Sequence, residues 1–341
     1  MLNIAIVGAG WYGCHIALSL IERGCSVTIF EDNGIFNGAA TKNQLRLHLG
    51  YHYLRSHSTR QQAKLGYEEF IAKYGFLTEV IPSNLYAVPF EDSLMDYGTV
   101  AQILDSEGLP HAQLKEDWNL WSSGFESVFR TEERLISPSK SKLFFEANLS
   151  KVLVFRHVTQ AEFDNLSRTY DFVIDASYSS RFFNSPAAVF EATLICEFEQ
   201  LWGQDIFHGL TLIDGELWSI FPTEKNYIRS LSHVRLGPVF QSKNESEVNE
   251  FIQASAGKRF DSELEAIRSH VIKHVPKLES SIDTIRTRFL SKKIKSGLVS
   301  AKRTTEVVFE ENRIFIQPGK IDAVFQSERL VVQHLREVSA L

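Results

Sequence analysis

A glycine-rich turn near the N-terminus restricts the possible folds of this chain more than any other feature. Residues 8–13 read Gly-Ala-Gly-Trp-Tyr-Gly and match the pattern GxGxxG. The apolar residues 4–7 predict a buried parallel strand before the turn, and residues 11–23 predict a helix after it. A second strand is predicted over residues 26–30. This order of strand, glycine turn, helix and strand is typical of a dinucleotide-binding βαβ unit.

Each glycine of the turn has its own expected task. Gly8 permits the tight turn, Gly10 lets the backbone approach a pyrophosphate, and Gly13 lets the helix pack closely on the strand. The start of the helix offers N–H groups and a partial positive charge to the phosphates. Glu31 ends the second strand, about twenty residues further on, where a carboxylate that binds ribose hydroxyls is expected.

The segment over residues 38–53 favours FAD over a nicotinamide cofactor. It combines small residues, a hydroxyl and an amide with a basic and aromatic cluster, which a plain NAD-binding unit would not need. Thr41 suits close approach to phosphate or ribityl oxygens. Arg46, His48 and His52 are spaced by even numbers of residues, so they would share one face of an extended chain. A polar loop with internally satisfied histidines is the alternative interpretation.

These features resemble the D-amino-acid-oxidase-type family of FAD-dependent oxidoreductases. The βαβ start, Glu31 and residues 38–66 carry the likeness, and Asn43 and His48 are most similar to the L-2-hydroxyglutarate oxidoreductase branch. The resemblance implies that residues 41–50 run past the pyrophosphate towards the isoalloxazine ring of FAD. It also implies that His48 lies near that ring.

Two later stretches resemble the same family. Residues 170–177 are similar to its second flavin-domain strand, which usually ends in glycine, but Tyr178 stands at that place. A Pro318-Gly319 turn precedes the last helix, and the resemblance implies that this helix start faces the flavin, where its dipole would stabilise the reduced form. Lys320 would add to that charge or be solvated.

The expected site residues form three groups. The cofactor contacts are expected to be Gly8, Gly10, Trp11, Tyr12, Gly13, Glu31, Asp32, Thr41, Asn43, Val158, Ala176, Gly319, Lys320 and Ile321. The catalytic residues are expected to be His48, His52 and Arg46, because imidazole can take a proton near neutral pH. The substrate contacts are expected to be Tyr53, Arg229, His233 and Arg235.

The last three residues form a predicted anion clamp. Arg229, His233 and Arg235 share parity on a predicted strand, so they would point to one face, and arginine suits bidentate binding of a carboxylate. An exposed strand face with solvated arginines is the alternative. Arg303, with Thr304 and Thr305, is a weaker candidate for the same task.

The element order predicts an α/β fold. We expect a Rossmann-like FAD-binding domain of the glutathione-reductase type, with an inserted, strand-rich α+β substrate domain. The FAD-binding domain is expected to be discontinuous, from residues 1–76, 136–185 and 300–341. The substrate domain is expected to take residues 77–135 and 186–299.

Composition excludes several classes of protein. The net charge of −6, without a long Lys/Arg run, argues against a nucleic-acid partner. The three cysteines form no CxxC pair and predict neither disulfides nor a metal site, which fits a reducing cytoplasm. The sequence contains no apolar stretch of about 18 residues, so no integral membrane segment is predicted.

The sequence therefore predicts an FAD-dependent oxidoreductase. It would oxidise a C–H bond that bears an amine or hydroxyl on a small, anionic substrate, by hydride transfer to the flavin, with oxygen or a quinone as electron acceptor. The alternatives are an NAD(P)-dependent dehydrogenase and a non-redox flavoprotein, such as a sugar isomerase or a binding protein with a degenerate site.

Overall fold

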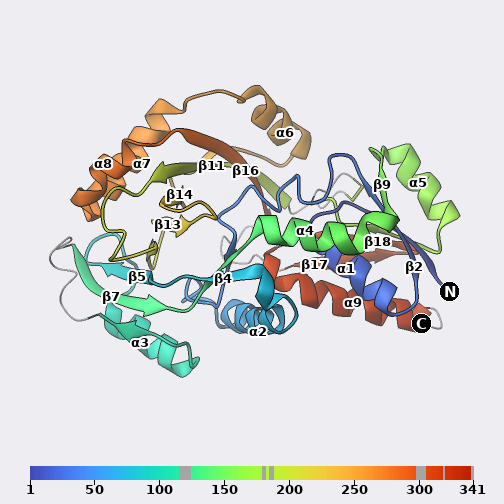
Figure 1. Ribbon diagram of the computed structural model, residues 1–341, viewed down its shortest axis with the longest axis horizontal. Coiled ribbons are helices and arrows are strands. Elements are labelled where there is room, and N and C mark those ends of the chain that lie inside the picture. The colour runs from blue at the N-terminus through green and yellow to red at the C-terminus, as the bar shows by residue number, and fades with distance from the viewer. Residues whose placement is uncertain (115–123, 179–181, 184–187, 297–304, 318, 339–341) are drawn as a thin grey trace.

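Two large sheets organise the computed structural model, with the nine-stranded sheet at the left of Figure 1 and the six-stranded sheet at the right. The structure describes residues 1–114, 124–178, 182–183, 188–296, 305–317 and 319–338. Arg303, Thr304 and Pro318 lie outside these residues. No helix in the described residues is long and apolar enough to cross a membrane.

The six-stranded sheet carries the glycine turn. Its strand order is β17-β18-β10-β1-β2-β9, and all neighbours are parallel except β17 and β18. The strands are β1 (Asn3–Val7), β2 (Ser26–Glu31), β9 (Leu153–Phe155), β10 (Phe172–Asp175), β17 (Glu306–Glu310) and β18 (Arg313–Gln317). The βαβ start is therefore built as its sequence pattern predicts.

Side chains from both faces of this sheet are buried. Ile4 and Ile6 share a core with helices α1, α2, α4 and α9, whereas Ala5 and Val7 share one with Phe163 of α5. Burial on both faces explains why β1 is apolar at successive positions. The helices are α1 (Trp11–Glu22), α2 (His57–Tyr74), α4 (Pro138–Leu149), α5 (Gln160–Thr169) and α9 (Val324–Val338).

The nine-stranded sheet is mostly antiparallel. Its order is β15-β11-β14-β13-β12-β5-β7-β6, with β16 also pairing with β11, and only β12 and β5 are parallel neighbours. The strands are β5 (Asn84–Pro89), β6 (Ala112–Gln113), β7 (Phe125–Thr131), β11 (Ala188–Glu199), β12 (Gly209–Leu212), β13 (Trp218–Pro222), β14 (Ile228–His233), β15 (Pro238–Ser242) and β16 (Thr287–Ser296). The associated helices are α3 (Tyr97–Ser106), α6 (Glu245–Ala254), α7 (Asp261–His274) and α8 (Glu279–Ile282).

A small sheet, with the order β3-β8-β4, completes the fold. Its strands are β3 (Arg46–Leu47), β4 (Thr78–Val80) and β8 (Arg134–Ile136). Short 3₁₀ helices occupy Gly75–Leu77, Ser150–Val152, Pro276–Leu278 and Ile321–Ala323. Arg46 pairs with Leu135 and Leu47 pairs with Arg134. The segment over residues 38–53 therefore lies beside the chain around residue 133.

The two large sheets draw on separate parts of the chain. The six-stranded sheet uses residues 3–31, 153–175 and 306–317, and the nine-stranded sheet uses residues 84–131 and 188–296. This separation supports the division into a discontinuous FAD-binding domain and an inserted substrate domain, which we retain as a proposal. Helices α3 and α5 were not predicted.

Glu328 of α9 joins the first and last helices of the FAD-binding half. Its carboxylate accepts a hydrogen bond from Ser19 and contacts His15 Nε2 at 2.9 Å and Arg23 at 3.2 Å. Burial alone would raise the pKa of Glu328, but these hydrogen bonds and charges lower it to about 2. The carboxylate is therefore ionised at neutral pH and holds α1 against α9.

Glu328→Gln should lower the free energy of unfolding at pH 7 by about 1.5–3 kcal/mol, the usual contribution of hydrogen bonds to a charged group. Because the folded pKa lies below the unfolded value of about 4.3, this stabilisation is present above about pH 4.3 and is lost as the pH falls towards 2. Urea unfolding at pH 7 and pH 3 measures it. The exposed Glu337→Gln on the same helix is the control, and an equal loss for Glu328→Gln at both pH values would contradict the account.

Candidate active site

A cavity of about 560 Å³ runs from the glycine turn of the six-stranded sheet to the inner strands of the nine-stranded sheet. Gly8, Gly10 and Glu31 line one part of it. Trp218 of β13 and Ser232 of β14 line another, with His48 and Tyr53 also in the wall. The cavity therefore joins the predicted nucleotide site to the predicted catalytic segment.

The three glycines of the turn differ in what surrounds them. A Cβ atom at Gly13 would lie 1.9 Å from the Gly8 carbonyl oxygen, and one at Gly8, whose φ is +103°, would lie 2.7 Å from the Ala176 oxygen. At both positions the backbone of the protein leaves no room for a side chain. A Cβ atom at Gly10 would meet no protein atom within 4 Å, although Gly10 lines the cavity. Gly10 thus leaves room for a bound group, as a pyrophosphate requires.

Glu31 is fixed at the end of β2 by backbone donors. Its Oε2 accepts the Ala9 N–H at 2.8 Å and its Oε1 accepts the Asn33 N–H at 2.9 Å. Each carboxylate oxygen can accept a second hydrogen bond. Burial raises the pKa of Glu31, and the two N–H groups oppose that change. These donors and lone pairs fit a carboxylate that receives ribose hydroxyls.

Tyr178 follows the backbone path that glycine usually takes. Its φ is +58°, in the left-handed region that favours glycine, and it lines the cavity two residues beyond Ala176. The left-handed conformation costs a residue with a side chain about 1–2 kcal/mol. The hydroxyl of Tyr178 donates to the Lys292 carbonyl at 3.2 Å, so the ring also connects this turn to β16.

Lys320 is buried beside the cavity, at the entry to the last helix. Its Nζ lies 4.0 Å from the Tyr53 ring centroid and 3.5 Å from Asp322 Oδ2. Its backbone oxygen accepts a hydrogen bond from Tyr12, whose hydroxyl also lies 2.9 Å from Thr305 Oγ1. Of the two roles considered for Lys320, the solvated one does not fit a side chain that is only 6% exposed.

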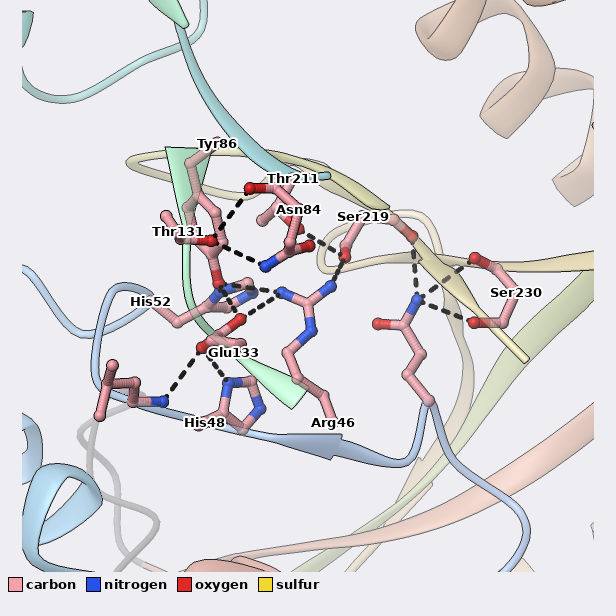
Figure 2. A network of polar contacts seen from close by, with 12 residues as sticks. Arg46, His48, His52, Asn84, Tyr86, Thr131, Glu133, Thr211, Ser219 and Ser230 are labelled. Carbon is pink, nitrogen blue, oxygen red and sulfur yellow. Dashed lines mark hydrogen bonds and ion pairs between the residues drawn. The ribbon is translucent and has the colours of Figure 1, made fainter. Parts of the chain in front are cut away.

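A network of polar contacts around Glu133 lies behind the part of the cavity wall that Arg46, His48 and His52 form (Figure 2). Glu133 Oε1 accepts the Leu49 N–H at 3.2 Å and lies 3.3 Å from His48 Nδ1. Glu133 Oε2 accepts from the Tyr86 hydroxyl at 2.8 Å and from the Arg46 guanidinium at 3.4 Å. The Tyr86 hydroxyl in turn lies 2.8 Å from His52 Nδ1. One buried carboxylate therefore organises both predicted histidines.

Arg46 connects this network to the nine-stranded sheet. Its guanidinium donates to Tyr86 at 2.9 Å and to Ser219 Oγ at 2.5 Å, and it stacks on the Phe221 ring at 4.1 Å. Both Arg46 and Glu133 are buried. Arg46 is the counter-charge of Glu133 at 3.4 Å, and its expected catalytic role stays a prediction.

Glu133 is not among the site residues predicted from the sequence. Residues 132–134 read Glu-Glu-Arg, which looks like an ordinary charged turn between two strands. The pairing of β8 with β3 places Glu133 beside His48. This contact joins residues that are far apart in the sequence, so no local pattern predicts it. Tyr86, Ser219 and Lys292 were missed for the same reason.

Most of the expected site residues line the cavity. The cofactor candidates in its wall are Gly8, Gly10, Trp11, Tyr12, Glu31, Asp32, Asn43, Val158, Ala176, Gly319, Lys320 and Ile321. The catalytic and substrate candidates in its wall are Arg46, His48, His52 and Tyr53. Gly13 lies beneath the turn, and Thr41 bonds to the Gly38 carbonyl at 3.3 Å; neither is part of the wall.

The predicted anion clamp is not brought to the cavity. Along β14 and just beyond it, Ser232 and Val234 line the cavity, so the opposite parity faces away. His233 is fully buried and bonds to His270 of α7, and Arg229 is buried with a hydrogen bond to the Ile228 carbonyl. Arg229 and His233 share a face of β14 as predicted, but that face points away from the cavity. Arg235 lies beyond the end of β14 and does not line the cavity either.

A second titratable cluster lies outside this cavity. Asp92, His270 and His274 place three ligand atoms within 4.8 Å of one another, a spacing that a metal ion could bridge. Lys273 Nζ already lies 2.7 Å from Asp92 Oδ2 and supplies a positive charge there. His270 Nδ1 is also engaged, at 2.6 Å from His233 Nε2. The cluster is therefore explained by contacts within the protein.

Comparison with known proteins gives the same cofactor class. A family model described as "FAD dependent oxidoreductase" matches residues 3–139. The chain is 29% identical to an FAD-dependent monooxygenase of Fusarium mangiferae over 345 aligned residues, which cover 99% of this chain and 92% of that protein. Nothing in these comparisons confirms the nearer likeness to the L-2-hydroxyglutarate branch.

Solved structures share the fold. A fructosyl peptide oxidase from Aspergillus nidulans matches with a TM-score of 0.72 and 12% identity, covering 99% of this chain and 91% of that one. Glycine oxidase from Geobacillus kaustophilus matches with a TM-score of 0.65 and 13% identity, covering 99% and 96% of the two chains. These likenesses confirm the predicted fold class.

Gly10→Val should remove bound flavin without unfolding the protein. The new side chain would enter the cavity rather than strike the chain, because no protein atom lies within 4 Å of its Cβ. We expect FAD affinity to fall at least about tenfold, or 1.4 kcal/mol, with little change in the melting temperature of the flavin-free protein. Flavin absorbance and thermal unfolding measure these effects.

Gly13→Ala provides the contrast. Its Cβ would lie 1.9 Å from the Gly8 carbonyl oxygen, so this variant should lose stability even without flavin. Normal flavin content in Gly10→Val would contradict the assignment of the pyrophosphate position.

Proposed function

We propose that this chain, whose residues 3–139 match a family model described as FAD dependent oxidoreductase, oxidises a carbon that bears an amine or a hydroxyl on a small substrate, by hydride transfer to FAD. The observation that carries the proposal is the cavity that leads from Gly10 and Glu31 to His48. A single cavity with nucleotide-binding groups at one part and proton-accepting groups at another suits this reaction.

FAD would be held by residues that the two ends of the FAD-binding half contribute. Glu31 would receive the ribose hydroxyls, Gly10 would admit the pyrophosphate, and the 3₁₀ helix Ile321–Ala323, which leads into α9, would face the flavin. When bound, FAD supplies the acceptor for the hydride, a task that no side chain performs.

The substrate would lie between the catalytic segment and the nine-stranded sheet. Trp218 and Ser232 offer an apolar surface and a hydroxyl there, and His48 reaches the same space. His48 would accept a proton from the substrate, because imidazole can exchange protons near neutral pH. Glu133 would stabilise the positive charge that His48 then carries.

A monooxygenase reaction is a second candidate. It is favoured by the printed name of the Fusarium relative, which is similar to this chain over nearly all of both proteins. The two reactions differ in the fate of molecular oxygen. In an oxidase the oxygen leaves as hydrogen peroxide, whereas in a monooxygenase one oxygen atom enters the product.

Anaerobic reduction of the bound flavin tests the proposed function. We expect the purified protein to show the absorption bands of oxidised FAD, and these should bleach on addition of a substrate drawn from paired small alcohols and amines. Flavin that stays oxidised with every compound of a broad panel would count against an oxidoreductase of this type. A chain that binds no FAD after reconstitution would contradict the cofactor.

Turnover under ¹⁸O₂ then separates the two reactions. An oxidase should give hydrogen peroxide in amounts equal to the product, with no label in the product, because oxygen only removes electrons from the flavin. One ¹⁸O atom per product molecule, measured by mass spectrometry, would favour the monooxygenase instead.

A further inference from the structure

We propose that the oxidised carbon bears a hydroxyl rather than an amine, and that Glu133 fixes His48 as the base that takes the hydroxyl proton. This inference rests on the proposed function and names its substrate class. It depends on the hydrogen-bond directions in the Glu133 network, which follow one after another from the contacts in Figure 2.

The first step is the charge of Glu133. Its side chain is fully buried, and burial alone would raise its pKa, but the Arg46 charge and the hydrogen bond from His48 lower the pKa to about 2. Glu133 is therefore an ionised carboxylate near neutral pH. An ionised carboxylate can only accept hydrogen bonds.

The second step is the tautomer of His48. His48 Nδ1 lies 3.3 Å from Glu133 Oε1, which must accept, so Nδ1 carries the proton. In the neutral ring, Nε2 then holds the lone pair. The His48 side chain is 21% exposed whereas Glu133 has no exposure, so the accessible edge of the ring is not the edge that faces Glu133. The ring therefore presents an acceptor nitrogen towards the cavity.

The third step gives the tautomer of His52. Burial raises the pKa of Tyr86, so its hydroxyl keeps its proton, and that proton goes to Glu133 Oε2 at 2.8 Å. The Tyr86 oxygen must then accept from its other neighbours, which are Arg46 at 2.9 Å and His52 Nδ1 at 2.8 Å. His52 therefore also carries its proton on Nδ1 and has an acceptor at Nε2. The two rings lie 5.3 Å apart, centroid to centroid.

An amine and a hydroxyl place different demands on these bases. A neutral amine has a lone pair that can assist departure of the hydride, and an ammonium group is a much stronger acid than a hydroxyl, so it can lose its proton before the hydride leaves. A hydroxyl is a far weaker acid, so its proton must be removed as the hydride leaves. A histidine that a buried carboxylate holds in one tautomer can remove the proton of a hydroxyl. Oxidation of an amine does not need such a base.

The reaction balances with the groups present in the proposed holoenzyme. The C–H bond breaks and its hydrogen leaves with the electron pair to FAD, which is reduced by two electrons. The O–H bond breaks and its proton goes to His48 Nε2, while the remaining electron pair forms the C=O bond of the product. The substrate thus loses a hydride and a proton, and the imidazolium that forms is stabilised by Glu133.

The charges in the cavity wall agree with a neutral hydroxyl group. Asp214 in the wall is paired with Arg55 at 2.8 Å, and Lys292 is paired with Glu245. Arg46 likewise balances Glu133. A substrate ammonium group would have to compete with these cations for a carboxylate. These ion pairs also do not favour the anionic substrate that the sequence predicts.

The experiment compares alcohols with amines on the same carbon skeletons, using anaerobic bleaching of the flavin in the FAD-loaded protein. Bleaching by an alcohol and not by its matched amine is expected. Faster bleaching by the amine would overturn the hydroxyl assignment while leaving the proposed function intact. Failure of every compound to bleach bound flavin would instead count against the proposed function.

Two variants test the assigned roles. With the alcohol, His48→Gln should slow bleaching by about 10²–10⁴-fold, the usual contribution of a general base, and Glu133→Gln should slow it on the order of 10²-fold. Glu132→Gln is the matched control, because it makes the same change at the exposed neighbouring residue. Equal rates in Glu133→Gln and the control would overturn the role of Glu133.

A measurement that needs no substrate keeps the inference falsifiable if Glu133→Gln folds poorly. Histidine ¹⁵N shifts in the FAD-loaded wild-type protein should report His48 and His52 as Nδ1–H tautomers at neutral pH. An Nε2–H tautomer at His48 would overturn the proposal, because the ring would then have no acceptor for the substrate. Where Glu133→Gln retains flavin, loss of the fixed His48 tautomer shows that Glu133 positions the ring.

Discussion

The structure around the cavity depends on one buried charge, the carboxylate of Glu133. An ionised group without exposure is costly unless donors surround it, and here Arg46, Tyr86, His48 and the Leu49 amide do so. These donors come from different parts of the chain. Because the charge must be satisfied, it fixes the small sheet against the nine-stranded sheet and sets the direction of the histidine rings.

Each of the two large sheets contributes a different part of the cavity wall. The six-stranded sheet carries the glycine turn: Gly8 and Gly13 close the turn against its neighbours, and Gly10 leaves it open to the cavity. The nine-stranded sheet supplies the Trp218 and Ser232 wall. The cavity therefore crosses from one sheet to the other.

Local patterns predicted the βαβ start because its features are local. The glycine turn and Glu31 follow from neighbours in sequence, whereas α5 of the same half was not predicted. The prediction of the anion clamp was wrong because the alternation of side chains along a strand shows which residues share a face, but not which face meets the cavity. Glu133 was missed because its role arises from strand pairing across distant parts of the chain.

A bound flavin should lie beside a histidine whose orientation Glu133 sets. A crystal structure of the FAD-loaded protein measures this arrangement. We expect the pyrophosphate at Gly10, the isoalloxazine ring in contact with the His48 side chain, and the Glu133 contact retained at His48 Nδ1. A flavin ring bound away from His48, or a His48 ring turned from Glu133 into solvent, would contradict it.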